Sequence, residues 1–362
     1  MIGKHKLKLD TPCLIIDKEK LLSNIKLMQN FATDNNKDVR PHAKTHKCPK
    51  ICELQLQEGS VGISITKPSE ALELVNCGIK NILITSPIVT SNKLRVFAKI
   101  LNVSPETIVV VDSFENLHQL NKLGMELSLK IKVLIDVDAG IGRTGLNFND
   151  AFDLAITASK NEHIELKGIQ CYAGHYQHII DINERRIATE TLLVRAGKLK
   201  SNLEKETGVD KLIQSGSGTG TYEIDCTIDA VTEIQPGSYT VMDKEYCDID
   251  KDINFKPAMT LLTTVISANH DTHVTVDAGT KAIYKETTYP EILNYNRLKY
   301  HWDGFGDEHG KITGDTLPIV GDVLEMIVPH CDPTINLHDV FYVTENDIVV
   351  EMWDISLRGK VQ

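Results

Sequence analysis

The sequence predicts an α/β protein made of a (β/α)₈ barrel followed by an antiparallel β domain. Short β-branched runs alternate with amphipathic stretches from about residue 15 to 240. The runs are continuously apolar, as expected for parallel strands that are covered on both faces. After about residue 245, β runs follow one another with few helical stretches between them, which is typical of an antiparallel sheet.

The barrel prediction depends on eight short strand-like runs. They are residues 39–43, 61–65, 81–85, 107–111, 130–138, 164–174, 212–218 and 231–237. Eight strands over this length match the size of a (β/α)₈ barrel, and a doubly wound open sheet is the alternative. The amphipathic stretches between them include residues 17–32, 69–78, 91–101 and 113–124, whose apolar residues recur at helical spacing.

Helix boundaries follow from capping residues. Asp17, Ser69 and Ser113 each stand where a helix is expected to begin, since their side chains can accept bonds from the first free amides. Gly78 and Gly124 are the predicted stops.

The β runs after the barrel cover residues 258–270, 273–279, 317–329 and 339–353. The predicted domains are residues 16–245 for the barrel and 246–362 for the β domain. Residues 1–15 are expected to join the β domain, because the barrel pattern begins only after them.

Composition limits the class of partner. The chain has 362 residues, a formal charge of -11, and 41% hydrophobic and 25% charged residues, which is ordinary for a globular protein. The acidic balance argues against nucleic acid or a membrane surface as the main partner, and no apolar run is long enough to span a bilayer. Eight scattered cysteines without a CxxC pair suggest reduced thiols and a cytoplasmic protein.

Lys44 is the first candidate catalytic residue. It lies in "RPHAKTHK", at the carboxyl end of the first predicted barrel strand, where barrels place their active sites. Neighbouring cationic groups and partial burial would lower the pKa of such a lysine and make its amine nucleophilic. A solvated basic turn is the alternative.

A glycine-rich stretch, "SGSGTGT" at residues 215–221, follows the seventh predicted strand. Its glycines let backbone amides approach an anion, and phosphate sites in barrels commonly follow the late strands. The candidate phosphate-binding residues are Ser217, Gly218, Thr219 and Gly220. A flexible loop is the alternative.

Two further strand ends carry candidate ligand-binding groups. Arg143, in "DVDAGIGRTG", could pair with a phenolate or carboxylate of a ligand, or form a structural pair with an aspartate. Gln170, Tyr172 and His175, in "QCYAGHYQH", could donate hydrogen bonds, stack or act as a base. Core packing of Tyr172 is the competing interpretation.

The segment "PHCDPTINLHD" suggests a metal site in the β domain. His330 and Asp332 are two residues apart, so both would lie on one side of an extended segment, with Cys331 on the other. Imidazole and carboxylate together suit Zn²⁺, Mn²⁺ or similar ions, although a bare His-x-Asp pair is a weak signal.

This combination resembles the pyridoxal-phosphate enzymes of the alanine-racemase fold type. "RPHAKTHK" with "HCDPTINLHD" narrows the resemblance to its metal-activated branch of D-threonine aldolases, D-3-hydroxyaspartate aldolases and eukaryotic-type D-serine dehydratases. Further motifs that look like this branch cover nearly the whole chain: "TPCLIIDKEKLLSNI", "CYAGH", "GSGTGTY", "PGSY", "VDAGTKA" and "DEHG".

The resemblance implies a role for each candidate. Lys44 would be the Schiff-base lysine, Arg143 would bond the cofactor ring, and Tyr239 of "PGSY" would join the phosphate loop. His330 and Asp332 would hold a divalent ion (Mn²⁺, Zn²⁺ or Mg²⁺). Dehydratase-like members usually carry His-x-Cys at these two positions, so His-x-Asp favours an aldolase.

The resulting hypothesis is a metal-dependent aldolase that cleaves D-3-hydroxy amino acids to glycine and an aldehyde. His175 or a metal-bound water would be the base. D-serine dehydration on the same scaffold is the alternative, and a non-enzymatic pyridoxal-phosphate-binding protein is a third hypothesis, disfavoured by the extra β domain. The resemblance also implies a homodimer.

Overall fold

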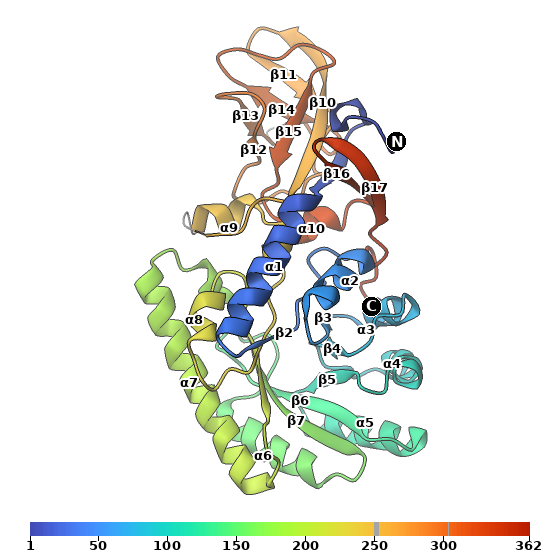
Figure 1. Cartoon of the computed structure of the whole chain (residues 1–362), viewed down its shortest axis with the longest axis vertical. Helices are drawn as coiled ribbons and strands as arrows, with labels where there is room; N and C mark the ends of the chain where they lie inside the picture. Colours follow the sequence, from blue (N-terminus) through green and yellow to red (C-terminus); the bar gives the residue numbers. More distant parts are fainter. Residues whose placement is uncertain (250–252, 303) are drawn as a thin grey trace. The chain divides into compact units, whose positions relative to one another are not determined.

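The computed structural model describes residues 1–249, 253–302 and 304–362 (Figure 1). The chain divides into two compact units. The first comprises Met1–Leu27, Thr45–Ile51 and Ser238–Gly359, and the second comprises Met28–Lys44, Cys52–Gly237 and Lys360–Gln362. The domain boundary expected at residue 245 stays a prediction.

The second unit contains eight parallel strands in the order β2-β9-β8-β7-β6-β5-β4-β3. Their bounds are β2 (Asp38–Val39), β3 (Ile63–Ile65), β4 (Ile82–Ile84), β5 (Ile108–Val111), β6 (Ile131–Asp136), β7 (Ile164–Cys171), β8 (Ile213–Gly216) and β9 (Glu233–Ile234). Seven of the eight predicted runs contain one of these strands, and the first run, residues 39–43, overlaps β2 only at Val39.

The two end strands of this sheet also meet. An isolated parallel bridge joins His42 to Ser64, and the Ser64 amide donates to the Pro41 carbonyl over 2.9 Å. The Val61 amide donates in the same way to the Val39 carbonyl. These bonds close the sheet, so the predicted barrel is confirmed and the open-sheet alternative is wrong.

Helices surround this sheet on its outer side (Figure 1). They are α1 (Lys18–Asp34), α2 (Pro49–Glu58), α3 (Pro68–Asn76), α4 (Ser91–Val103), α5 (Phe114–Leu127), α6 (Phe148–Lys160), α7 (Ile182–Thr207) and α8 (Tyr222–Cys226). A 3₁₀ turn, η2 (Gly174–His178), follows β7. The start of α1 and residues 49–51 of α2 belong to the first unit.

Three predicted helix boundaries are confirmed. The Asp17 carboxylate accepts the Lys20 amide at the start of α1, and the Ser113 hydroxyl accepts the Asn116 amide at the start of α5. Gly78 follows the end of α3 with φ +85°, a conformation that favours glycine.

Two predicted boundaries are wrong. Ser69 is the second residue of α3, because Pro68 occupies the first position, where its missing amide hydrogen costs nothing. Gly124 lies inside α5, which continues to Leu127. A β-carbon at Gly124 would lie 2.7 Å from the His163 carbonyl oxygen, so this glycine permits close packing of the helix and does not stop it.

The first unit contains a nine-stranded sheet. Its strands are β1 (Cys13–Asp17), β10 (Met259–His270), β11 (His273–Val276), β12 (Glu291–Ile292), β13 (Lys299–His301), β14 (Gly310–Thr313), β15 (Val323–Ile327), β16 (Val340–Glu345) and β17 (Ile348–Asp354). Short helical elements accompany it: η1 (Lys6–Lys8), η3 (Ser238–Thr240), α9 (Lys244–Ile249) and α10 (Cys331–Ile335).

β1 shows that the N-terminal segment belongs to this sheet. It pairs antiparallel with β10 and parallel with β16, and every other strand pair of the sheet is antiparallel. The predicted antiparallel β domain that includes the extreme N-terminus is therefore confirmed. Along the described parts of the chain, no helix combines the length and apolar character needed to cross a membrane.

Candidate active site

Four of the predicted site residues line one pocket of about 290 Å³ in the barrel unit: Lys44, Arg143, Gln170 and Tyr172. Gln170 lies in β7 and Tyr172 directly follows it, whereas Lys44 lies in the segment after β2 and Arg143 in the loop after β6. Because the carboxyl ends of parallel strands meet at one end of a barrel, residues distant in sequence converge there. The remaining lining residues are His42, Thr66, Lys67, Thr85, Ser86, Thr144 and Gln235. The pocket therefore offers two amines, a guanidinium, an imidazole and several amide and hydroxyl groups.

Arg143 extends from the loop after β6. Its guanidinium carbon lies 5.5 Å from the centroid of the Tyr172 ring, close enough for a cation–π contact. The loop is shaped by Asp138, whose carboxylate accepts the amides of Gly140 and Gly142 over 2.9 and 3.1 Å. Asp138 thus bonds the loop backbone, and the loop presents Arg143 beside the Tyr172 ring.

Asp136, at the end of β6, is a buried carboxyl beside this pocket. One oxygen accepts the Gln170 amide over 2.9 Å, and the other accepts the Thr144 hydroxyl over 2.7 Å. Burial raises its pKa to about 6, against the lowering effect of these two bonds. No role of its own was predicted for Asp136 from the sequence, although a carboxylate that ends an apolar strand was a usable signal.

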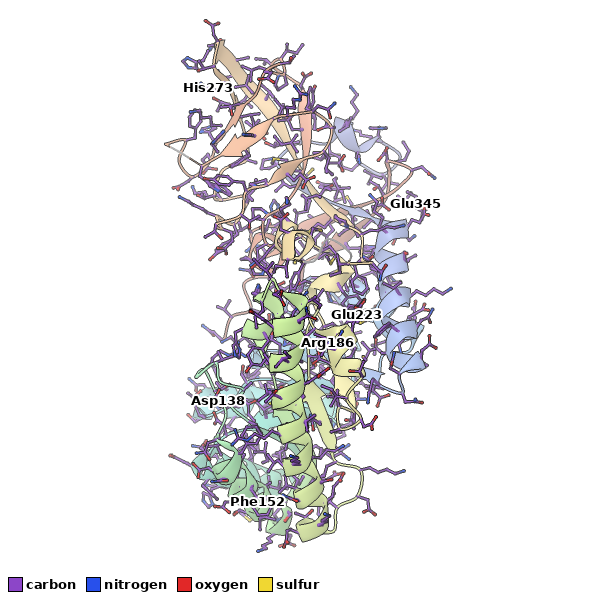
Figure 2. All side chains as sticks on the ribbon, turned by 90° about the vertical axis from the view of Figure 1, so that its left-hand side faces the viewer. Asp138, Phe152, Arg186, Glu223, His273 and Glu345 are labelled. Atoms are coloured by element: carbon purple, nitrogen blue, oxygen red, sulfur yellow. The ribbon has the colours of Figure 1, made fainter. Side chains whose placement is uncertain are left out.

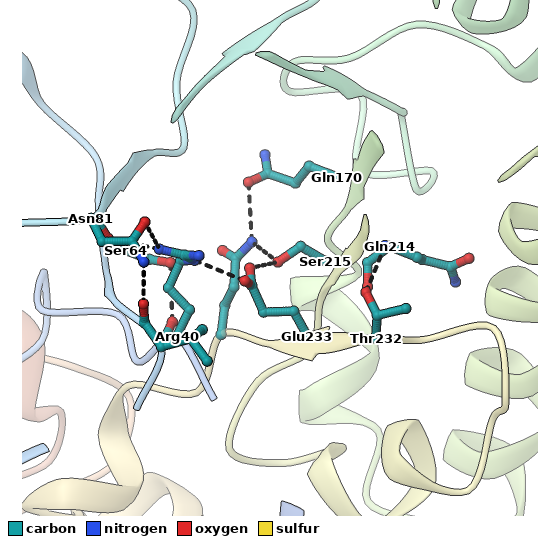
Figure 3. A network of polar contacts seen from close by, with 10 residues as sticks. Arg40, Ser64, Asn81, Gln170, Gln214, Ser215, Thr232 and Glu233 are labelled. Atoms are coloured by element: carbon teal, nitrogen blue, oxygen red, sulfur yellow. Dashed lines mark hydrogen bonds and ion pairs between the residues drawn. The ribbon is translucent and has the colours of Figure 1, made fainter. Parts of the chain in front are cut away.

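A buried polar network continues from Gln170 across the barrel (Figure 3). Gln235 donates to Gln170 over 3.3 Å and to Ser215 over 2.8 Å, and Ser215 donates to Glu233 over 2.6 Å. Glu233 forms a buried ion pair with Arg40 over 2.8 Å. Because each member bonds the next, the network holds the Gln170 carboxamide in one orientation at the pocket wall.

The glycine-rich loop follows β8, as predicted, but its residues are not among those that line the pocket. Ser217 has φ 75°, an uncommon conformation for a residue with a side chain, and its hydroxyl donates to the Asp225 carboxyl over 2.5 Å. Burial raises the pKa of Asp225 to about 7. A deeply buried group of α8 therefore anchors the first residue of the loop.

His175 lies on η2, outside the residues that line the pocket. Its ring is exposed and packs on Tyr176, with 4.1 Å between ring centroids. A β-carbon built at Gly140 would lie 3.9 Å from His175 Nε2, so the imidazole faces the loop that carries Arg143.

Tyr239, His330 and Asp332 belong to the first unit. Tyr239 is buried in η3, with its ring edge against Phe255 at 5.5 Å between centroids. His330 has extended backbone, φ -140° and ψ 123°, directly before α10.

The prediction that residues 330–332 form one extended segment is wrong, because α10 begins at Cys331. Pro333 occupies the first turn of this helix, where proline is tolerated. Cys331 is fully buried, its amide donates to the Asp243 carboxylate over 3.0 Å, and burial raises the pKa of its thiol well above the usual value. The burial of Cys331 therefore follows from helix packing and not from strand alternation.

The donors at this helix start suit a divalent ion that keeps water ligands. His330 and Asp332 offer one imidazole and one carboxylate, and His330 Nδ1 lies 3.5 Å from a Glu245 carboxylate oxygen. A carboxylate on one ring nitrogen commonly orients a histidine whose other nitrogen binds metal. Among the described residues, no three histidine, cysteine, aspartate or glutamate side chains are grouped to hold a metal ion. The donors therefore fit an open site better than a closed structural zinc site.

Comparison with known proteins identifies related chains. Residues 16–245 match the family model described as the alanine racemase N-terminal domain, and residues 258–344 match the putative serine dehydratase domain. D-threonine aldolase of Arthrobacter sp. is 34% identical over 97% of this chain and 93% of that protein. 3-Hydroxy-D-aspartate aldolase of Paracoccus denitrificans (strain Pd 1222) is 31% identical over 99% of this chain and 94% of that protein. The crystal structure of D-threonine aldolase from Filomicrobium marinum superposes with a TM-score of 0.94 at 29% identity, covering 100% of this chain and 99% of that one.

Proposed function

The chain belongs to the family of the alanine racemase N-terminal domain, and from that premise we propose that it is a pyridoxal-phosphate- and divalent-metal-dependent aldolase. The substrates are D-3-hydroxy amino acids such as D-threonine, which it cleaves to glycine and an aldehyde. Two relatives named as aldolases of this substrate class, each similar along nearly its whole length, support the proposal. The observation that carries it is the position of Lys44 in a polar pocket with Arg143, Gln170 and Tyr172.

The pocket's donor set fits pyridoxal 5′-phosphate. Lys44 offers the amine for the cofactor's aldehyde, and Arg143 offers a cation for the ring's phenolic oxygen. Gln170 and Tyr172 are proposed to orient the ring. Ser217, Gly218, Thr219 and Gly220 are proposed to bind its phosphate, with Tyr239 beside them. When bound, the cofactor supplies an electron sink for the electron pair released as the Cα–Cβ bond breaks.

The proton transfer is assigned to this chain's own groups. His175 Nε2 is proposed to accept the proton of the substrate's β-hydroxyl, which must leave before the aldehyde can form. The Asp136 carboxyl, which accepts bonds from Thr144 and Gln170, is proposed to hold the Gln170 carboxamide in one orientation at the pocket wall.

We propose that His330 and Asp332 hold the divalent ion, which is Mn²⁺, Zn²⁺ or Mg²⁺. When bound, such an ion acts as a Lewis acid toward a hydroxyl group. Glu245 Oε2 lies 3.5 Å from His330 Nδ1, so the other ring nitrogen, Nε2, is the proposed ligand atom.

D-serine dehydration, yielding pyruvate and ammonia, is the second candidate. The match of residues 258–344 to a putative serine dehydratase domain keeps it open. Asp332, which stands where dehydratase-like members usually carry cysteine, favours the aldolase. A non-enzymatic cofactor-binding protein is the third hypothesis, and the additional β domain, with the proposed metal ligands at the start of α10, counts against it.

Product analysis distinguishes the three activities. We expect purified protein with pyridoxal phosphate and Mn²⁺ or Zn²⁺ to convert D-threonine to acetaldehyde and glycine, with little pyruvate from D-serine. Dominant pyruvate formation would reject the aldolase in favour of the dehydratase. Formation of neither product, from protein that binds the cofactor, would favour the non-enzymatic hypothesis.

We also propose a homodimer, on the family resemblance. Sedimentation of a fully active monomer at the assay concentration would contradict it. The cytoplasmic location inferred from the scattered cysteines stays a prediction.

A further inference from the structure

Gln177, on η2, is a buried glutamine that joins two parts of the candidate site. It has 2% exposure. Its carboxamide oxygen accepts the Gly220 amide over 3.2 Å, and its carboxamide nitrogen donates to the Tyr172 hydroxyl over 3.0 Å. Gly220 belongs to the glycine-rich loop, and Tyr172 lines the pocket that contains Lys44. One side chain therefore connects the loop to the pocket wall.

These two bonds fix which way the carboxamide faces. The Gly220 amide can only donate, so it requires the carboxamide oxygen, and the nitrogen must then face Tyr172. Tyr172 accepts this bond, which leaves its own hydroxyl proton available to a second acceptor. The orientation of Gln177 thus prepares Tyr172 to act as a donor.

The glycines of the loop are shaped around Gln177. A β-carbon at Gly218 would lie 2.0 Å from the Gln177 carboxamide oxygen, and one at Gly220 would lie 2.8 Å from the Gln177 carbonyl oxygen. Neither position can hold a larger residue without displacing this side chain or its backbone. The loop's glycine pattern is therefore explained at two positions by contact with Gln177.

The peptide groups of Gly220 are also held from the other side. Arg185, a buried residue of α7, donates to the Gly220 carbonyl over 3.2 Å. α7 and α8 pack against each other, and Figure 2 shows them with Arg186 and Glu223 labelled. With Gln177 on its amide and Arg185 on its carbonyl, Gly220 is positioned before any ligand arrives.

We propose that Gln177 is a positioning residue that sets the preference of this site for a phosphorylated cofactor. By clamping the loop to Tyr172, it keeps the loop amides and hydroxyls at one distance from the pyridine-binding pocket. The phosphate ester of the cofactor then binds loop amides and hydroxyls that are already in position, whereas the ring binds in the pocket that contains Lys44. The inference rests on the proposed function, because it assumes that pyridoxal phosphate is the ligand.

The test compares pyridoxal phosphate with pyridoxal, which has the same ring and aldehyde but no phosphate. Each is titrated into cofactor-free protein and followed by absorbance. Gln177→Met keeps the volume of the side chain but removes both hydrogen bonds. We expect its Kd for pyridoxal phosphate to rise about tenfold, the effect of losing one to two buried hydrogen bonds, with less than about a twofold change for pyridoxal.

A second variant covers the case in which Gln177→Met does not fold. Gln177→Glu keeps the acceptor for Gly220 but loses the donor to Tyr172 and places a negative charge against the loop. We expect it to weaken the binding of pyridoxal phosphate more than Gln177→Met does, and again to change the binding of pyridoxal little.

Gln214→Ala is the matched control, because Gln214 is an equally buried glutamine of β8 that bonds the Leu193 carbonyl instead of the loop. We expect the preference of this variant for pyridoxal phosphate over pyridoxal to equal that of the wild type.

Each outcome decides the inference. If the Gln177 variants bind both ligands more weakly to the same extent, the inference is overturned. Tighter binding of pyridoxal phosphate, as expected if Gln177 competes with the phosphate, would also overturn it. The same loss of preference in Gln214→Ala would show that the effect of the Gln177 variants comes from general destabilisation of the protein, which also overturns the inference. Failure of the wild-type protein to bind either ligand would refute the proposed function, whereas tight wild-type binding with unchanged Gln177 variants would refute only the role of Gln177.

Discussion

Lys44→Ala is expected to abolish the visible absorbance of protein-bound pyridoxal phosphate and to lower turnover by at least about 10³-fold. The amine of Lys44 is the group proposed to bond the cofactor's aldehyde, and alanine offers no nucleophile in its place. Absorbance spectra of the reconstituted variant measure the first effect, and acetaldehyde release from D-threonine measures the second. Borohydride reduction followed by peptide mass spectrometry should locate the cofactor on Lys44 in the wild-type protein.

The matched control is Lys67→Ala. Lys67 lines the same pocket and is therefore the competing amine, whereas Lys47, the last residue of "RPHAKTHK", is not among the lining residues. We expect Lys67→Ala to keep the visible absorbance. If Lys44→Ala retains that absorbance and Lys67→Ala loses it, the lysine that carries the cofactor is Lys67 and not Lys44.

His330→Ala is expected to leave cofactor binding intact while turnover falls roughly 10²- to 10⁴-fold, the effect of losing several kcal/mol of Lewis-acid stabilisation. The covalent link is proposed to form at Lys44, and His330 is not one of the proposed cofactor ligands, so the link needs nothing from the imidazole. Metal content after dialysis, the cofactor spectrum and the rate of D-threonine cleavage separate these effects. Chelation of the wild-type protein should reproduce the variant, and added Mn²⁺ or Zn²⁺ should restore only the wild type.

Asp332→Ala should behave like His330→Ala, and Cys331→Ala provides the contrast. Cys331 is fully buried in the first turn of α10, so its truncation is expected to lower the melting temperature, with metal content unchanged. Should Cys331→Ala lose the metal while Asp332→Ala keeps it, Asp332 would not be the second ligand, and it would no longer favour the aldolase over the dehydratase.

The barrel strands were predictable because their signal is local. A continuously apolar run such as residues 107–111 must be covered on both faces wherever it lies, and it forms β5 as expected. The same holds for the cap at Ser113, which bonds an amide three residues away. The motifs around Lys44 and Arg143 were also recognisable, since residues at strand ends converge in any parallel barrel.

Packing between distant segments could not be predicted in this way. Gly124 has the composition of a helix stop but serves a close contact with His163, and residues 330–332 have the spacing of a strand but begin a helix. Gln177 carried no sequence signal, because its role depends on Tyr172 and Gly220, five and 43 positions away. The amino-acid sequence thus predicts the succession of barrel strands, the candidate Schiff-base lysine and the candidate metal-binding pair. Tertiary contacts alone decide which polar side chains meet in the pocket and which hold its loop, because hydrogen-bond partners and close backbone approaches arise between segments that local patterns do not connect.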